Sequence, residues 1–116
     1  MTVETMLKDC STFFTHSMNE LTRKAPDYKG PDGQAFGDLG EIARDMECSI
    51  ERVALIHASK HWTAIKRYLL GNELKSENIR KRLMDLANYC AMIDVLIESG
   101  ETKRIVDTFD AGPTGG

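Results

Sequence analysis

Polar side chains that could bind a ligand crowd into one short stretch of the chain, residues 76–89. At 100° per residue, four of them would share one quadrant of a helix: Glu77, Lys81, Asp85 and Asn88. This polar stripe flanks an apolar stripe rather than opposing it, so it would face a groove between helices. Arg82 lies one turn back on the other side of Asp85, and a guanidinium is a good phosphate ligand. The stretch is therefore the best candidate for chemistry or ligand binding.

Acidic side chains in two helical segments could instead hold a divalent cation. Glu77 and Asp85 lie two turns apart, and such carboxylates bind a metal ion when another helix supplies further oxygens. Glu41 and Asp45 form a second acidic pair, one turn apart. For Glu77, the alternative is an intrahelical ion pair with the basic residue one turn later. For Asp85, beside the apolar stripe, a functional role or a buried polar network is favoured.

The middle of the chain offers a second set of phosphate ligands. His57 and Lys60 would share one helix face, with His61 about a quarter-circle away. Trp62 could stack on a base, although a solvated face with Trp62 in the core is the simpler interpretation. The two histidines lack the glutamate of HExxH, because Ala58 follows the first one, and this excludes a zinc protease of that type.

Composition limits the possible partners. The chain has 116 residues, which fits one domain. Its net charge of −3 predicts no strong binding to nucleic acid or to an anionic membrane. No segment reaches the roughly 20 apolar residues of a membrane span, and no signal-peptide pattern is present. Cys10, Cys48 and Cys90 are widely spaced and sit at apolar positions, which favours reduced core cysteines in a cytoplasmic protein. The glycines match neither a Rossmann nor a P-loop motif.

Helical periodicity accounts for most of the chain. The expected helices cover residues 2–24, 39–47, 50–70 and 77–99. Ser49 and Ser76 are placed to cap the second and third long helices, and Gly71 and Gly100 to end them. Because the connections are short, we expect a compact antiparallel bundle of three long helices and one short helix, an all-α fold.

The remaining segments are assigned by composition and pattern. Residues 25–38 are expected to form a loop, because two prolines and three glycines exclude regular structure there. The single domain would end at residue 100, followed by a flexible tail, residues 101–116. In the short helix, Ile42, Ala43 and Met46 are expected to face inward. The last helix carries the clearest core stripe: Ile79, Leu83, Leu86, Cys90, Ile93 and Ile97.

Residues 56–98 resemble a known family. The patterns Lys60-His61-x-x-x-Ile65 and Ser76-Glu77-x-Ile79-x-x-Arg82-x-x-Asp85-x-x-Asn88-Tyr89 look like those of small helical proteins of bacteriophages and prophages. The run Asp85-Leu86-Ala87-Asn88-Tyr89 is similar to the last-helix signature of the nucleotide-modification-associated domain. That domain is thought to be related to the all-α MazG-type nucleoside triphosphate pyrophosphohydrolases. The resemblance implies a MazG-like bundle, a homo-oligomer and the cytoplasm of an infected or lysogenic bacterial host.

The chain departs from the MazG-type pattern in its acidic residues. Those enzymes bind Mg²⁺ through a Glu-Glu-x-x-Glu cluster and a Glu-x-x-Asp pair. Here Arg82 stands three residues before Asp85, and the nearest counterpart of the first cluster is Glu41-x-x-x-Asp45-x-Glu47. A groove poor in acids and rich in bases would bind phosphate directly rather than through Mg²⁺. The departure therefore favours binding over hydrolysis.

Three functions remain as hypotheses. The favoured one is a phage-type nucleotide-binding protein that sequesters or senses a nucleotide signal in a counter-defence role. Its ligand-binding residues would be Lys60, His61, Arg82, Asp85 and Asn88. The first alternative is a Mg²⁺-dependent pyrophosphohydrolase of (deoxy)nucleoside triphosphates, with these metal ligands: Glu41, Asp45, Glu77 and Asp85. The second alternative is a non-catalytic interaction module that pairs with a copy of itself.

Overall fold

The computed structural model describes residues 1–29, 33, 35–72 and 78–100, and in this part of the chain it contains helices and no strand. The elements, in chain order, are α1 (Val3–Lys24), the 3-10 helix η1 (Ala25–Tyr28), α2 (Gly37–Asp45), α3 (Ile50–Leu69) and α4 (Ile79–Ser99). The predicted all-α bundle of three long helices and one short helix is confirmed. The predicted flexible tail, residues 101–116, lies outside the described residues.

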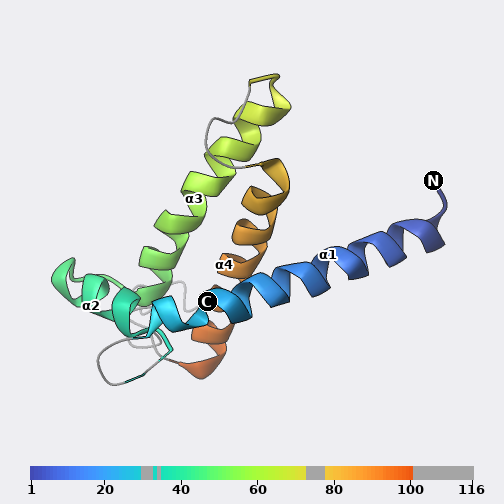
Figure 1. Ribbon diagram of the computed structural model, residues 1–116. Coiled ribbons are helices and arrows are strands. Elements are labelled where there is room, and N and C mark those ends of the chain that lie inside the picture. The colour runs from blue at the N-terminus through green and yellow to red at the C-terminus, as the bar shows by residue number, and fades with distance from the viewer. Residues whose placement is uncertain (30–32, 34, 73–77, 101–116) are drawn as a thin grey trace, which may run out of the picture.

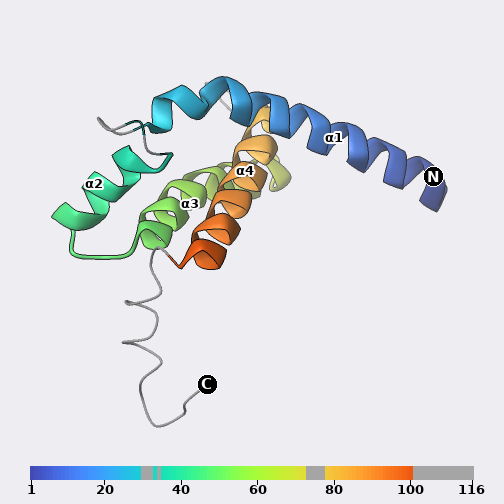
Figure 2. The ribbon, with the colours of Figure 1, turned by 90° about the horizontal axis from the view of Figure 1, so that it is seen from below.

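An antiparallel hairpin of α3 and α4 forms the centre of the fold (Figure 1). α1 packs across α4 with its C-terminal half, and α2 packs against α3. The N-terminal half of α1 projects beyond the hairpin, as Figures 1 and 2 show from two directions. None of the described helices is long and apolar enough to cross a membrane.

The helix ends follow local sequence signals, with one exception. The Thr2 and Ser49 hydroxyls accept hydrogen bonds from backbone N–H groups of α1 and α3, as N-cap residues do. Gly71 and Gly100 have φ values of +97° and +75° and follow α3 and α4, as predicted. The predicted cap of α4 was wrong: Asn78 caps it, accepting a 2.8 Å hydrogen bond from the Lys81 N–H. Ser76 lies outside the described residues.

The first connection contains more helix than the sequence predicts. Ala25–Tyr28 forms η1, with Pro26 in its first turn, where a missing N–H group costs no hydrogen bond. α2 begins at Gly37, two residues before the predicted start. Prolines and glycines therefore do not exclude regular structure at either end of this segment.

The main core lies between α2, α3 and α4. Its buried members are Leu39, Ala43, Val53 and Ala54. Ala43 faces inward as predicted, but Ile42 and Met46 are exposed. The difference arises because α2 packs on α3 along a narrow line, which covers Leu39 and Ala43 and leaves the neighbouring positions in solvent.

α4 buries a different face from the one predicted. Its buried residues are Asp85, Asn88, Met92 and Leu96. At 100° per residue this line lies about a third of a turn from the predicted apolar stripe, on which Leu83, Cys90 and Ile97 are exposed. The physical reason is that α4 has two neighbours, α3 and α1, and α1 covers the side that carries Asp85 and Asn88.

The three cysteines are free, and only Cys48 approaches the core. Cys48 is half-buried against the α2–α3 cluster, whereas Cys10 and Cys90 are exposed. The predicted core role is therefore wrong for two of them, because the apolar stripes of α1 and α4 on which they lie are incompletely covered.

Candidate functional site

The C-terminal half of α1 is fixed to α4 by a buried polar network. The Ser17 hydroxyl donates a 2.8 Å hydrogen bond to Asn88 Oδ1, and Asn88 Nδ2 donates a 3.0 Å hydrogen bond back to the Ser17 carbonyl oxygen. Ser17 Oγ also lies 3.2 Å from the carbonyl oxygen of Met84. Both side chains are buried. Asn88, predicted as a ligand-binding residue, therefore joins two helices.

Two turns further along α1, an ion pair forms a second connection between α1 and α4. Lys24 Nζ lies 2.8 Å from Asp85 Oδ1, and the side chains are 23% and 7% exposed, respectively. Asp85 thus belongs to a buried polar network, as the sequence had suggested. Sequence reasoning missed Ser17 and Lys24, although one signal was present: they interrupt the apolar stripe of α1 seven residues apart.

α3 and α4 complete this group with a histidine and an arginine. His61 Nδ1 lies 3.2 Å from Arg82 Nη1 and 3.9 Å from Asp85 Oδ2. Because a guanidinium can only donate hydrogen bonds, the contact with Arg82 assigns His61 Nδ1 as the acceptor. The proton of a neutral imidazole is then on Nε2. We call these four residues, Lys24, His61, Arg82 and Asp85, the Asp85 cluster.

A stack of rings adjoins the Asp85 cluster. The Tyr89 ring lies 5.9 Å from the His57 ring and 5.8 Å from the His61 ring, with interplanar angles of 8° and 26°. Burial lowers the pKa of His57 below 6.5, and the positive charge of Lys60 lowers it further. The stack connects α3, which carries both histidines, with α4, which carries Tyr89, beside the Asp85 cluster.

Further charges surround the cluster on α1 and α4. Arg23 forms an ion pair with Glu20 at 2.9 Å, and this hydrogen bond lowers the pKa of the Glu20 carboxyl. The positive charges of Lys24 and Lys81 lower it as well. Within the Asp85 cluster, Lys24 and Arg82 carry positive charges and Asp85 carries a negative charge. These three described side chains therefore have a positive net charge although the whole chain is negative.

The predicted ligand-binding set is brought together only in part. His61, Arg82 and Asp85 meet in the Asp85 cluster. Lys60 is exposed on α3 and acts on His57 instead. Trp62 is 57% exposed, so the alternative that placed it in the core is wrong.

The predicted metal set is not assembled in the described residues. Glu41 and Asp45 are exposed on α2, and Asp85 is bound to an ammonium group. Among the residues that the structure describes, no three His, Cys, Asp or Glu side chains form a group that could hold a metal ion. Glu77 lies outside the described residues.

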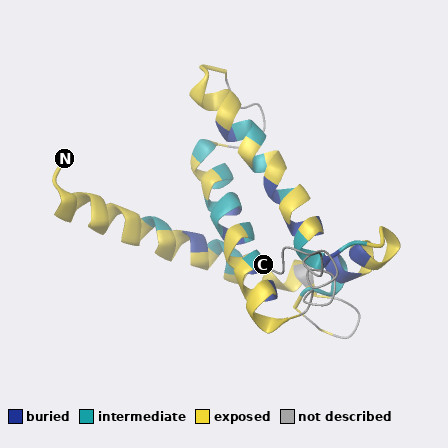
Figure 3. Ribbon diagram, turned by 180° about the vertical axis from the view of Figure 1, so that it is seen from behind, coloured by how far each residue is buried: buried dark blue, intermediate teal, exposed yellow. Residues whose placement is uncertain are grey.

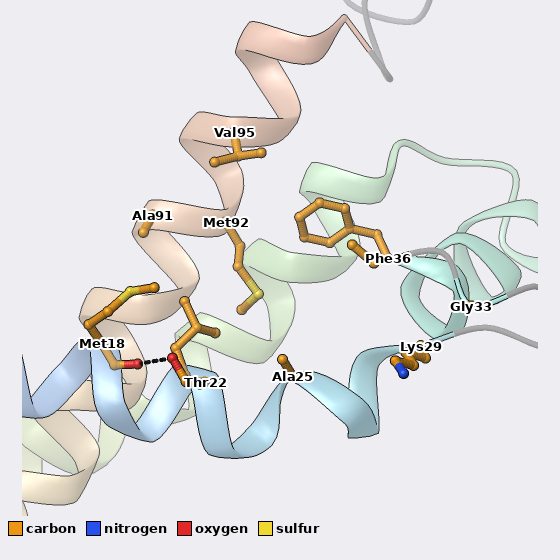
Figure 4. Close-up of a pocket in the computed structure, with 11 residues that line it drawn as sticks. Met18, Thr22, Ala25, Lys29, Gly33, Phe36, Ala91, Met92 and Val95 are labelled. Atoms are coloured by element: carbon orange, nitrogen blue, oxygen red, sulfur yellow. Dashed lines mark hydrogen bonds between the residues drawn. The ribbon is translucent and has the colours of Figure 1, made fainter.

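An apolar groove that the sequence did not indicate lies on another part of the α1–α4 contact (Figure 4). It has a volume of about 480 Å³. Met18 and Leu21 line it from α1, Phe36 from the first connection, and Met92 and Val95 from α4. Its lining is suited to an apolar group, and Lys29 adds a charged side chain to the described lining residues.

Comparison of the chain with protein families, with curated proteins and with solved structures finds no match. The resemblance to the MazG-like domain therefore stays a prediction.

Proposed function

We propose that the protein is a small nucleotide-binding protein that sequesters or senses a nucleotide or nucleotide signal. One observation carries the proposal: Lys24 and His61 lie against the carboxylate of Asp85, and Arg82 lies against His61, beside a stack of rings. Basic side chains bind the phosphate group of a nucleotide, and aromatic rings stack on its base.

The charge balance supports phosphate as the bound group. Asp85 neutralises one of the two fixed positive charges and holds Lys24 in place through a 2.8 Å contact. Arg82, which is half-buried and lies against His61, carries the second positive charge, and a guanidinium is a good phosphate ligand. Beside the cluster, the Tyr89 and His61 rings supply aromatic groups of the kind on which a base can stack.

The alternative, a Mg²⁺-dependent pyrophosphohydrolase, has less support from the geometry. It would require Asp85 to exchange its ammonium partner for a metal ion, and Lys24 Nζ lies at hydrogen-bonding distance from Oδ1. A counter-defence role in the cytoplasm of an infected or lysogenic bacterium follows from the resemblance and is part of the same proposal.

Thermal unfolding with a panel of nucleotides tests the proposal. The panel contains nucleoside mono- and triphosphates, cyclic dinucleotides and inorganic pyrophosphate, each without and with Mg²⁺. A ligand at about 100 times its Kd stabilises the folded state by about 2.7 kcal/mol, which gives a clear rise in the midpoint. We expect this rise in the wild type and in Arg44→Gln, a matched control on the exposed surface of α2, but not in Arg82→Gln.

Two further results decide between binding and hydrolysis. If no compound on the panel raises the midpoint, the nucleotide proposal is wrong. If pyrophosphate is released from triphosphates only with Mg²⁺ and this activity is lost in Asp85→Asn, the hydrolase alternative is correct instead.

Self-association is a second candidate function, because the fold leaves large apolar side chains in solvent. The exposed ones lie on all three long helices and include Val3, Leu7, Phe14, Leu55, Trp62 and Ile97. A contiguous exposed apolar face is typical of interaction sites, and Val3, Leu7 and Phe14 lie along one face of α1. It supports the expectation of a homo-oligomer.

A further inference from the structure

The apolar stripe of α1 continues past the part that its own chain covers. Positions spaced by alternating steps of four and three form this stripe: Val3, Leu7, Cys10, Phe14, Ser17, Leu21 and Lys24. From Ser17 onward the stripe contacts α4 through the polar network and the ion pair. Before Ser17, Val3, Leu7 and Phe14 are 69%, 60% and 63% exposed. Figure 3 shows this half of α1 coloured almost entirely as exposed.

We propose that residues 3–14 of α1 pair antiparallel with the same residues of a second copy of this chain. The inference rests on the proposed self-association and is independent of nucleotide binding. A partner helix would remove from water the apolar side chains that this half of α1 leaves exposed.

The surface of α1 already has the shape that such pairing requires. A shallow hollow of about 590 Å³ runs along the helix. Six of its seven lining residues lie at i, i+3, i+4 and i+7 in two overlapping sets, 7/10/11/14 and 11/14/15/18, and the seventh is Asn19. Four residues at this spacing form the hole that receives one side chain of a partner helix in coiled-coil packing. The hollow therefore offers two successive holes, four residues apart.

The chain itself carries two side chains at the matching spacing. Val3 and Leu7 are also four residues apart, and an antiparallel partner would insert Leu7 into the first hole and Val3 into the second. This register pairs Leu7 with Cys10 and Val3 with Phe14, so a larger side chain always faces a smaller one. The charged residues of the segment, including Lys8 and Asp9, lie off the stripe.

The fold of each copy selects the antiparallel direction. In a parallel pair, the two α3–α4 hairpins would lie at the same end of the paired helices and compete for the same space. In an antiparallel pair they lie at opposite ends, because the paired half of α1 projects beyond its own hairpin (Figure 2). The overlap of twelve residues is about 18 Å long, which suits a small, concentration-dependent interface rather than an obligate one.

Sedimentation over about 1 μM to 1 mM, the range of weak interfaces, tests the pairing. We expect a reversible dimer whose Kd rises about 30-fold or more in Leu7→Glu, because a charge would enter the first hole. Thr12→Glu is the matched control: it adds the same charge to an exposed position on the same helix, away from the stripe, and should leave the Kd unchanged. Circular dichroism at a monomeric concentration verifies that both variants are folded.

Disulfide formation between introduced cysteines tests whether the two α1 helices pair antiparallel or parallel. Val3→Cys and Phe14→Cys are each placed in a Cys10→Ser/Cys90→Ser background and oxidised alone or mixed. The antiparallel register gives a disulfide-linked dimer only in the mixture, and a link within either variant alone indicates parallel pairing and overturns the proposal. A wild-type monomer throughout the range would contradict self-association itself. If the wild type forms a dimer that Leu7→Glu does not weaken, the protein self-associates but through another interface. Neither a monomeric wild type nor an unaffected dimer bears on nucleotide binding.

Discussion

Replacing Lys24 by methionine should destabilise the fold more than any other single loss of charge on α1. The substitution keeps much of the side-chain volume but removes the ammonium group that lies 2.8 Å from Asp85 Oδ1. Asp85 is 7% exposed, so solvent can replace little of that contact. Breaking a fully buried pair in this way costs about 3–5 kcal/mol. Because Lys24 is 23% exposed and water can enter its place, we expect a loss of about 2–3 kcal/mol.

Urea unfolding of four proteins measures this loss and its origin. They are the wild type, Lys24→Met, Asp85→Asn and the double variant. Since Asp85→Asn removes the buried charge, the double variant should be more stable than the sum of the two single losses implies, by about 1–2 kcal/mol. Lys8→Met makes the same change at an exposed position of the same helix and should stay within about 0.5 kcal/mol of the wild type.

A loss below about 0.5 kcal/mol in Lys24→Met would refute the reasoning, because that is the value of a solvent-exposed pair. Strict additivity in the double variant would also refute it, since it would show that Lys24 and Asp85 act independently. Either result would remove the fixed ammonium group from the proposed phosphate site.

Two other contacts give predictions of their own. Ser17→Ala should cost about 1–3 kcal/mol in urea unfolding, because it leaves the buried Asn88 Oδ1 without its 2.8 Å donor, whereas the exposed Ser59→Ala should cost little. In an NMR titration, His57 should show a pKa below 6.5 that rises in Lys60→Met without returning to 6.5, because burial is the larger cause. With this lowered pKa, the unfolded state binds the imidazole proton more readily than the folded state. His57 should therefore lower the free energy of unfolding as the pH falls below about 6.5 and have no effect well above that pH. An unshifted pKa of His57 would contradict this prediction.

The polar residues of α4 show how far sequence reasoning reached. Their position beside an apolar stripe predicts a function or a buried polar network for Asp85 and Asn88, and both are buried in polar contacts. Their partners, Ser17 and Lys24, lie 71 and 61 residues away in the sequence. No local pattern specifies such pairs, because they depend on which helix crosses α4 and at which turn.

The helices and their ends were set by the sequence itself. The 3.6-residue periodicity, the capping side chains of Thr2 and Ser49, and the left-handed glycines Gly71 and Gly100 act within a few residues of one another, so a linear pattern contains them. The tertiary structure alone decided which face of each helix is covered. The most apolar stripe of α4 stays partly exposed while a line containing Asp85 and Asn88 is buried, because α1 supplies matching hydrogen bonds and charge on that side. Burial depends on what a neighbouring helix offers, and that neighbour is known only once the chain has folded.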